Sequence, residues 1–335
     1  MRIRPSNIYS YVFCLVALAL GGERIGAEEL WEKGWQKSAQ NPILSLSPKG
    51  EFDSHNIFAP AIAKHDGVYY LYYSGGPSGE RTGEELINYQ LGLATSEDGV
   101  NFTKHGRPLL PLGERDNFHA TPTLLRDPAG NLQLDEDGIW HLFYNGNRPD
   151  DVEHATSNDG IHWEKDPQNP IFKKAYAPNL LKVGDEYRMY YIHKPKGDNW
   201  QVHLATGPDI YSLKSHPNNP VLTVSQEWEA KHMCYPYVLQ DGDTWVMFYV
   251  AYWDDGSGIQ KTAIGTATSP DGIEWTKYDK NPVLTPIPDS EYESVYNSSQ
   301  AVIRDGDVYR LFYASRIDLI HKYFAINLAT KPAEE

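Results

Sequence analysis

The stretch WQKSAQNPIL, residues 35–44, decides the fold because its pattern returns throughout the chain. In each copy a short polar run leads to a proline that is followed by two aliphatic or aromatic side chains. The other copies are FTKHGRPLL from Phe102, WEKDPQNPIF from Trp163, SLKSHPNNPVL from Ser212 and WTKYDKNPVL from Trp275. Recurrence at a spacing of about 60 residues indicates a fold built from internal repeats.

Three further kinds of strand recur in each repeat. The first kind is a short predicted strand with a proline at its head. Its copies lie at Pro60, Pro122, Pro178, Pro236 and, without the proline, Gln300. An aromatic strand such as VYYLYYSG follows each time, and then a strand that ends in Ala-Thr, such as LGLAT. Runs of aromatic and β-branched residues bounded by turn residues are typical of strands. Each repeat therefore contributes four short strands.

The two ends of the chain complete each other. The fifth repeat stops after its third strand, INLAT at residues 326–330, and the opening stretch 35–44 is the fourth strand that it lacks. Pairing of these strands closes a ring and leaves no open sheet edge. The sequence therefore predicts an all-β, five-bladed β-propeller with four antiparallel strands per blade, closed by the N-terminal strand. We expect residues 28–335 to form this single domain.

A Ser-x-Asp-Gly motif precedes three of the aromatic–proline segments, at SEDG (96–99), SNDG (157–160) and SPDG (269–272). Aspartate in such a motif bonds to its own backbone, and glycine accepts a positive φ angle. We interpret these segments as turns. The aromatic residue three positions after each glycine is expected to pack on its blade.

Composition and charge exclude several classes of protein. The chain of 335 residues has a net charge of -15, which argues against a nucleic-acid partner. Residues 1–27 have the basic, apolar and small-residue regions of a secretory signal peptide, so we expect a secreted or periplasmic protein with no membrane contact after cleavage. Of the two cysteines, Cys14 lies in this leader and only Cys234 remains, so no disulfide is expected within one chain.

One rim of the predicted propeller carries the variation between blades. The loops between second and third strands are long and differ from blade to blade, for example SGGPSGERTGEELIN and NGNRPDDVE, whereas the hairpins on the opposite face are short and similar. Binding residues concentrate in variable loops on a rigid scaffold. An acid recurs where four of the five segments enter this rim, at Asp53, Asp116, Glu229 and Glu293. Such recurrence also fits a repeated structural role.

Residues that break the repeat are better site candidates than those that keep it. By this criterion the predicted substrate-binding residues on the rim are His55, His119, Lys231, His232, Tyr296 and Asn297, and Trp253 is added as an aromatic residue that could stack on a sugar ring. Tryptophan in this position offers a flat ring on which a sugar can stack. The 13% aromatic content is consistent with a surface that faces carbohydrate.

The five repeats, the aromatic second strand and the motif Asp-Gly-Ile-x-Trp followed by Asn-Pro resemble the five-bladed β-propeller glycoside hydrolases, the superfamily of families 43, 32, 62, 68, 117 and 130. The similarity covers about residues 30–332 and implies hydrolysis or transfer of glycosides by acidic residues in a central funnel. Many members have Asp-Pro at the head of the first inner strand, where this chain has Ala59-Pro60.

Three functional hypotheses follow. The first is a glycosidase acting on a poly- or oligosaccharide with Asp53 as base or nucleophile, Glu229 as acid, and Asp116 and Glu293 in reserve for positioning. The second is a carbohydrate-binding propeller that has lost the acid/base residues. The third is a metal ion held by His55, His119 and His232, against which stands a simple polar role for each histidine. No cofactor and no bound metal are indicated.

Overall fold

The computed structural model describes residues 29–77, 88–113, 118–146, 148, 150–193, 199–253, 256–317 and 325–333. The predicted signal peptide and Asp116 lie outside these ranges. The described residues form strands and turns and no helix, so no described helix could serve as a membrane span. The prediction of an all-β protein is confirmed.

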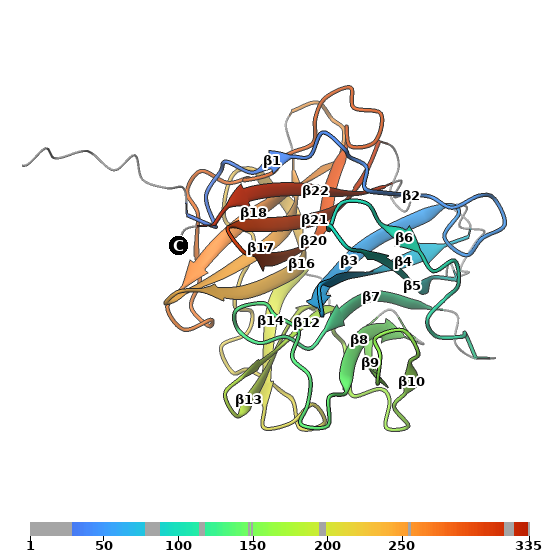
Figure 1. Ribbon diagram of the computed structural model, residues 1–335. Helices are drawn as coiled ribbons and strands as arrows, with labels where there is room; N and C mark the ends of the chain where they lie inside the picture. The colour runs from blue at the N-terminus through green and yellow to red at the C-terminus, as the bar shows by residue number, and fades with distance from the viewer. Residues whose placement is uncertain are drawn as a thin grey trace, which may run out of the picture.

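The strands group into five blades that follow one another around the molecule, from the blue β3 to the red β22 (Figure 1). Blade 1 contains β3 (Asn56–His65), β4 (Val68–Gly76), β5 (Gln90–Ser96) and β6 (Thr103–Lys104). Blade 2 contains β7 (His119–Leu124), β8 (Trp140–Gly146), β9 (Asp151–Ser157), β10 (Glu164–Lys165) and β11 (Phe172–Lys173). Blade 3 contains β12 (Tyr176–Val183), β13 (Glu186–His193), β14 (Gln201–Gly207) and β15 (Lys214–Ser215).

The last two blades share one sheet, because Thr262 pairs with Tyr296 in parallel. Blade 4 contains β16 (Glu229–Asp241), β17 (Thr244–Trp253), β18 (Lys261–Ser269) and β19 (Thr276–Lys277). Blade 5 contains β20 (Tyr296–Asp305), β21 (Val308–Arg316), β22 (Ala325–Pro332), β1 (Gln36–Lys37) and β2 (Leu44–Ser45). Within each blade, strands that pair with each other are antiparallel.

The N-terminal strand closes the ring, as predicted. Gln36 pairs with Thr330, and Leu44 pairs with Ile326, so both β1 and β2 run antiparallel to β22. Figure 1 shows the blue β1 beside the red β22. Lys331 is 1% exposed and donates to the backbone oxygens of Glu29, Glu32 and Lys33, which anchors the segment before β1.

The prolines of the inner strands lie within these strands, so the prediction that they head them was wrong. The residue before each proline, or before Gln300, has a positive φ angle between 46° and 52°, and the pairing register shifts there; these residues are Ala59, Thr121, Ala177, Tyr235 and Ser299. A bulge leaves one backbone N–H out of the ladder, and proline has none to lose. Each inner strand therefore starts several residues before the proline or Gln300, and its pairing is interrupted by a bulge at that position.

The Asn-Pro motif has a role that the sequence did not disclose. In four blades its asparagine bonds to both the N–H and the carbonyl of one residue on the third strand: Asn41 to Leu328, Asn169 to His154, Asn219 to Leu204, and Asn281 to Thr266. A side-chain amide can satisfy both groups because it carries a donor and an acceptor. The segment after the fourth strand is thereby fixed to the blade.

The Ser-x-Asp-Gly segments are turns, as predicted. Ser157 Oγ accepts from the Gly160 N–H at 2.9 Å, and Asp159 accepts from the N–H groups of Ile161 and His162. These turns also join blades, because the Tyr72 hydroxyl of blade 1 donates to the Gly160 carbonyl at 2.6 Å. Trp163 is 7% exposed, as expected for a packing residue, whereas Trp275 is only half-buried.

Candidate active site

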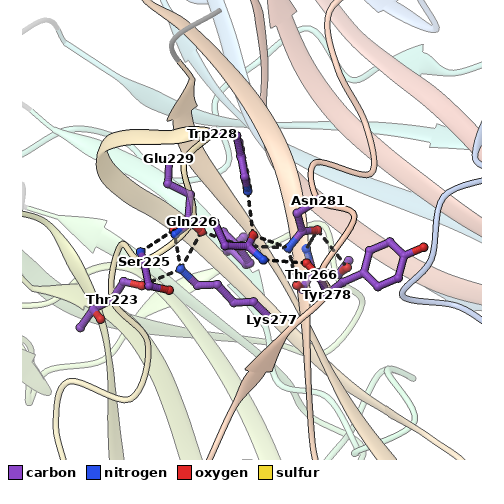
Figure 2. A network of polar contacts seen from close by, with 10 residues as sticks. Thr223, Ser225, Gln226, Trp228, Glu229, Thr266, Lys277, Tyr278 and Asn281 are labelled. Carbon is purple, nitrogen blue, oxygen red and sulfur yellow. Dashed lines mark hydrogen bonds and ion pairs between the residues drawn. The ribbon is translucent and has the colours of Figure 1, made fainter.

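Glu229 is the centre of a buried polar cluster in blade 4 (Figure 2). Lys277 Nζ lies 2.6 and 2.5 Å from its two carboxylate oxygens, and the Tyr249 hydroxyl donates to Oε1 at 2.7 Å. The backbone N–H groups of Ser225 and Gln226 donate to Oε2 at 2.7 and 2.9 Å. The carboxylate, 4% exposed as a residue, therefore has all its lone pairs engaged within the blade.

The same arrangement recurs at two other predicted acids. In blade 1, Asp53 Oδ2 accepts from Tyr73 at 2.8 Å and from Lys104 at 2.6 Å. In blade 5, Glu293 Oε2 accepts from the hydroxyl of Tyr313 at 3.0 Å and from the ammonium of Lys37 at 2.7 Å. The acids are 1% and 0% exposed. Each cluster joins the segment that enters the blade to its second and fourth strands.

Blade 3 lacks both charges of this cluster. Its tyrosine, Tyr191, has Ser215 in place of the lysine, with the two hydroxyl oxygens 3.1 Å apart, and the position of the acid is apolar. Lysine and acid are therefore absent together in blade 3 and present together in blades 1, 4 and 5. Because a buried charge needs a partner, this pattern is what a structural ion pair predicts.

The electrostatics of the clusters point the same way. Burial raises the pKa of the Tyr249 hydroxyl, and the charge of Glu229 raises it further, so this tyrosine remains a hydrogen-bond donor. Burial also lowers the pKa of Lys277, and Glu229 opposes this effect. The geometry favours a structural role for Asp53, Glu229 and Glu293. The hypothesis that Asp53 and Glu229 form a catalytic pair stays a prediction.

The predicted binding residues fall into separate places. His119 is fully buried, with Nε2 3.0 Å from Lys165 Nζ and its ring edge-on to Tyr144. Asn297 is also fully buried, and Lys231 is exposed. His55 and Trp253 are half-buried at strand ends, and Lys261 Nζ lies 5.8 Å from the centre of the Trp253 ring.

His232 and Tyr296 belong to one continuous surface, which we call the aromatic arc and which crosses blades 3 to 5 on the predicted functional rim. Its members are Tyr176, Trp200, His232, Tyr252 and Tyr296. Successive ring centres are 6.1, 5.4, 5.4 and 6.4 Å apart, and the rings of Trp200 and His232 are stacked. Tyr296 is 2% exposed and the other four are half-buried, so these four keep part of their surface open to solvent. Arg316 lies over the Tyr296 ring at 3.1 Å.

The axis of the propeller holds a small pocket without a carboxylate. Its volume is about 40 Å³, and the five bulges of the inner strands form its wall, with the side chains of Thr121, Asn179, Tyr235, Ser299 and Gln300 among its lining. A glycosidase of the usual kind places two carboxyl groups on either side of the scissile bond. An acid that does chemistry in this chain would therefore lie outside the axial pocket, on the rim.

Asp151 is such an acid, and the sequence analysis missed it. It begins β9 directly after the loop NGNRPDDVE, and it is half-buried. Burial raises its pKa, the charge of Asp150 raises it further, and Lys173 and Arg148 oppose the shift. A carboxyl group with a raised pKa is typical of general acids. Its position in a variable rim loop was the available signal.

Asn145 ties Asp151 to the aromatic arc. Its amide nitrogen donates to the backbone carbonyls of Asp151 at 3.1 Å and Ala175 at 2.8 Å. Its carbonyl oxygen accepts from the Ala177 N–H at 2.8 Å and the Thr121 hydroxyl at 2.6 Å. Because Ala175 and Ala177 flank Tyr176, this single buried side chain fixes Asp151 relative to the first ring of the arc.

The described residues do not assemble a metal centre. No group of three or more His, Cys, Asp or Glu side chains in the described ranges is placed to hold an ion. His119 faces a lysine and His232 stacks on Trp200, so the histidines of the third hypothesis have different surroundings.

Comparison with known proteins supports the resemblance seen in the repeats. The N-terminal domain of glycosyl hydrolases family 32 matches residues 177–315. A 1,2-beta-oligomannan phosphorylase from Thermoanaerobacter sp. (strain X514) is 23% identical over 290 residues, which are 82% of this chain and 91% of that protein.

Solved structures share the fold at low sequence identity. A protein described as a glycoside hydrolase superposes with a TM-score of 0.71 at 18% identity, covering 89% of this chain and 92% of the other. A beta-1,2-mannobiose phosphorylase from Listeria innocua gives a TM-score of 0.68 at 16% identity, covering 89% and 97%. The predicted propeller fold and the resemblance to five-bladed glycoside hydrolases are thereby confirmed.

Proposed function

We propose, from its resemblance to the five-bladed β-propeller glycoside hydrolases, that this chain is a carbohydrate-active enzyme that cleaves a glycosidic bond on its variable rim. The observation that carries the proposal is the aromatic arc together with Asp151, whose backbone carbonyl shares the Asn145 amide with the residues that flank Tyr176. Aromatic faces bind the apolar faces of sugars, and a carboxyl group with a raised pKa can protonate the leaving oxygen.

Asp151 would act as the general acid. In its protonated form it donates the proton to the glycosidic oxygen as the bond to the anomeric carbon breaks. The carboxylate that remains is stabilised by Lys173 and Arg148, the same charges that oppose its raised pKa. Burial of the group favours the neutral, proton-bearing form at the start of the reaction.

The second reactant is water in a hydrolase and inorganic phosphate in a phosphorylase. Hydrolysis needs a second carboxylate to activate water, whereas phosphate is itself a nucleophile and needs cations that bind it. The nearby charges of Arg148 and Lys173 favour phosphorolysis as a second candidate, in line with the similarity to two phosphorylases. We propose β-1,2-linked mannosides as the first substrates to test, because both of these relatives are named for them.

Cleavage assays with and without phosphate distinguish these reactions. Purified protein is incubated with β-1,2-mannobiose and a panel of oligosaccharides, in phosphate-free buffer and in 10 mM phosphate, a concentration of about 10 to 10⁴ times a millimolar to micromolar KM. Release of free sugar without phosphate indicates hydrolysis, and sugar 1-phosphate formed only with phosphate indicates phosphorolysis. Binding of saccharides with no cleavage in either buffer would support the binding-module hypothesis and refute the enzyme proposal.

Substitution of the acid tests its role directly. Asp151→Asn keeps the size of the side chain and removes the proton donor, so we expect kcat/KM to fall by about 100-fold or more. Asp185→Asn, which removes an exposed carboxylate on the opposite face, serves as the matched control and should retain most of the activity. Equal activity of Asp151→Asn and the parent protein would refute the assignment.

A further inference from the structure

A cavity of about 540 Å³ lies between blades 2 and 3 on the face opposite the aromatic arc. Its walls come from the β7–β8 connection, from β10 and the residues after it, and from the turn between β14 and β15. These segments join first to second and third to fourth strands, so they share the face away from the variable loops. A pocket of this size suits a small ligand.

The floor of this cavity breaks the repeat of the blades. The third strands of blades 1, 3 and 5 have leucine two positions before the threonine of Ala-Thr, at Leu93, Leu204 and Leu328, whereas blade 2 has His154. This histidine is 2% exposed and stacks on Phe143 with ring centres 4.9 Å apart. Blade 4 has Thr266 at this position, and a buried polar ring where three blades have leucine needs hydrogen-bond partners.

His154 is the middle of a chain of hydrogen bonds that reaches the cavity from both sides. Its Nδ1 lies 2.7 Å from Asp166 Oδ2, and its Nε2 lies 2.9 Å from His141 Nδ1. His141 Nε2 in turn lies 3.3 Å from Asp135 Oδ2. The hydroxyl of Tyr211 completes the chain by donating to Asp166 at 2.5 Å.

The two histidines of this series of hydrogen bonds carry too few N–H protons to satisfy every acceptor in it. Burial lowers the pKa of His141, and burial lowers that of His154 to about 4, so both rings are neutral at pH 7. Two neutral imidazoles carry two N–H groups for three contacts. We assign the two N–H groups to the two shortest contacts, from His154 to Asp166 and from His141 to His154. The His141 Nε2 lone pair then faces the Asp135 carboxylate across the longest contact, 3.3 Å. At this point the wall presents two neighbouring acceptors, Asp135 and His141, which favours a ligand that donates.

The opposite wall of the cavity offers a flat apolar surface. Tyr211 is 47% exposed although its hydroxyl is held by Asp166, so the ring has a fixed orientation. Leu125, Ile210 and Pro167 add aliphatic surface. An oriented aromatic face next to hydrogen-bond acceptors matches the two faces of a sugar ring, one with C–H groups and one with hydroxyls.

We propose that this cavity is a second saccharide-binding site, which holds one or two neutral sugar units against Tyr211 with their hydroxyls donating to Asp135 and His141. An amine could donate to the same acceptors, but it would not pack against the Tyr211 ring and the aliphatic side chains of the opposite wall. The site lies away from Asp151, so it goes beyond the proposed function and does not depend on catalysis. It would hold a polysaccharide on the protein while another part of the chain is cleaved at the rim.

Affinity electrophoresis in native gels tests the proposal with defined probes. The gels contain soluble mannan, arabinan, galactan or xylan, and mobility is compared with a gel without polysaccharide. We expect retardation by at least one of them, and we expect Tyr211→Ala and Asp135→Asn to weaken it by about tenfold or more in apparent Kd. Asp185→Asn, an exposed acid in the β12–β13 turn of the same face, is the charge control, and Val100→Ala, at the equivalent turn position of blade 1, is the control for the ring.

Cleavage of a disaccharide by the same variants separates this proposal from the proposed function. Unchanged disaccharide cleavage with lost retardation supports the second site, and so does lost retardation in a protein with no activity. The proposal is refuted if Tyr211→Ala is retarded like the parent protein, or if no polysaccharide retards the parent. It is also refuted if methylammonium protects the protein against thermal unfolding through these residues and saccharides do not.

Discussion

Lys277 Nζ lies 2.6 and 2.5 Å from the two carboxylate oxygens of Glu229, and both side chains are buried. Removing one partner of a buried pair costs about 3–5 kcal/mol because the other charge remains unpaired. We therefore expect Glu229→Gln to lower the free energy of unfolding by about this amount, as measured by urea denaturation at pH 7. The specific activity of the folded fraction should stay within about threefold of the parent.

The double variant Glu229→Gln/Lys277→Met is the control, because it removes both charges. Its stability should lie above that of Glu229→Gln alone, as the natural absence of both charges in blade 3 suggests. A stable Glu229→Gln protein whose activity has fallen by about 100-fold would instead support the catalytic role expected from the sequence.

The aromatic arc should determine substrate affinity. Tyr252 lies between His232 and Tyr296, with ring centres 5.4 and 6.4 Å away, and it is half-buried. Tyr252→Ala removes a sugar-facing ring, and we expect KM for an oligosaccharide to rise by about 5- to 50-fold with a smaller change in kcat. Tyr211→Ala on the opposite face is the matched control and should leave KM for a disaccharide unchanged. Equal KM values for both variants would place the substrate elsewhere.

His154 makes the folded protein sensitive to acid. Its pKa is about 4 in the folded chain because of burial, below the ordinary value of 6.5, so the unfolded state takes up this proton first as pH falls. Stability should therefore be full above pH 6.5 and decline by about 3 kcal/mol toward pH 4 through this group. His154→Leu, the residue of blades 1, 3 and 5, should show a smaller decline in urea titrations at pH 7 and 5. Part of the slope should remain because His203 also has a pKa of about 4.

Because the N-terminal strand closes the ring, we predict that the protein does not fold without it. A chain that lacks residues 29–46 loses β1 and β2, the backbone acceptors of Lys331 and the Lys37 partner of Glu293. We expect this truncation to be insoluble or unfolded by circular dichroism, because β22 becomes an open edge and two charges lose their partners. A soluble truncation with the parent melting temperature would contradict the closure.

The sequence predicts local structure well where one residue type has one physical role. The Ser-x-Asp-Gly turns and the closing strand could be predicted because glycine, aspartate and the repeat pattern leave few alternatives. The partners of Asp53 could not be predicted from local pattern, because Lys104 is 51 residues away and meets it only when the fourth strand pairs. Alignment of the repeats contained that signal, since lysine is replaced by Ser215 where the acid is missing.

The functional candidates were harder because their signals are not periodic. Asp151 lies in a loop that resembles no other loop of the chain, and its raised pKa depends on burial that only the fold creates. The series of hydrogen bonds from Asp135 to Tyr211 joins two blades, so it cannot be seen within the sequence of a single repeat. His232 and Tyr296 were found because they depart from the repeat, and the structure places both in the aromatic arc.

The pairing of β1 with β22 also sets the order in which the protein can fold. Gln36 of β1 pairs with Thr330 of β22, and most of the chain lies between them in sequence. Because β1 is made before β22, it stays unpaired until β22 has been made. Contacts between residues this far apart in sequence slow folding, because the loop must close before the contact stabilises it. Blades 1 to 4 can form before β22 is made, but blade 5 is complete only when β22 is available, and β1 has no partner strand until then.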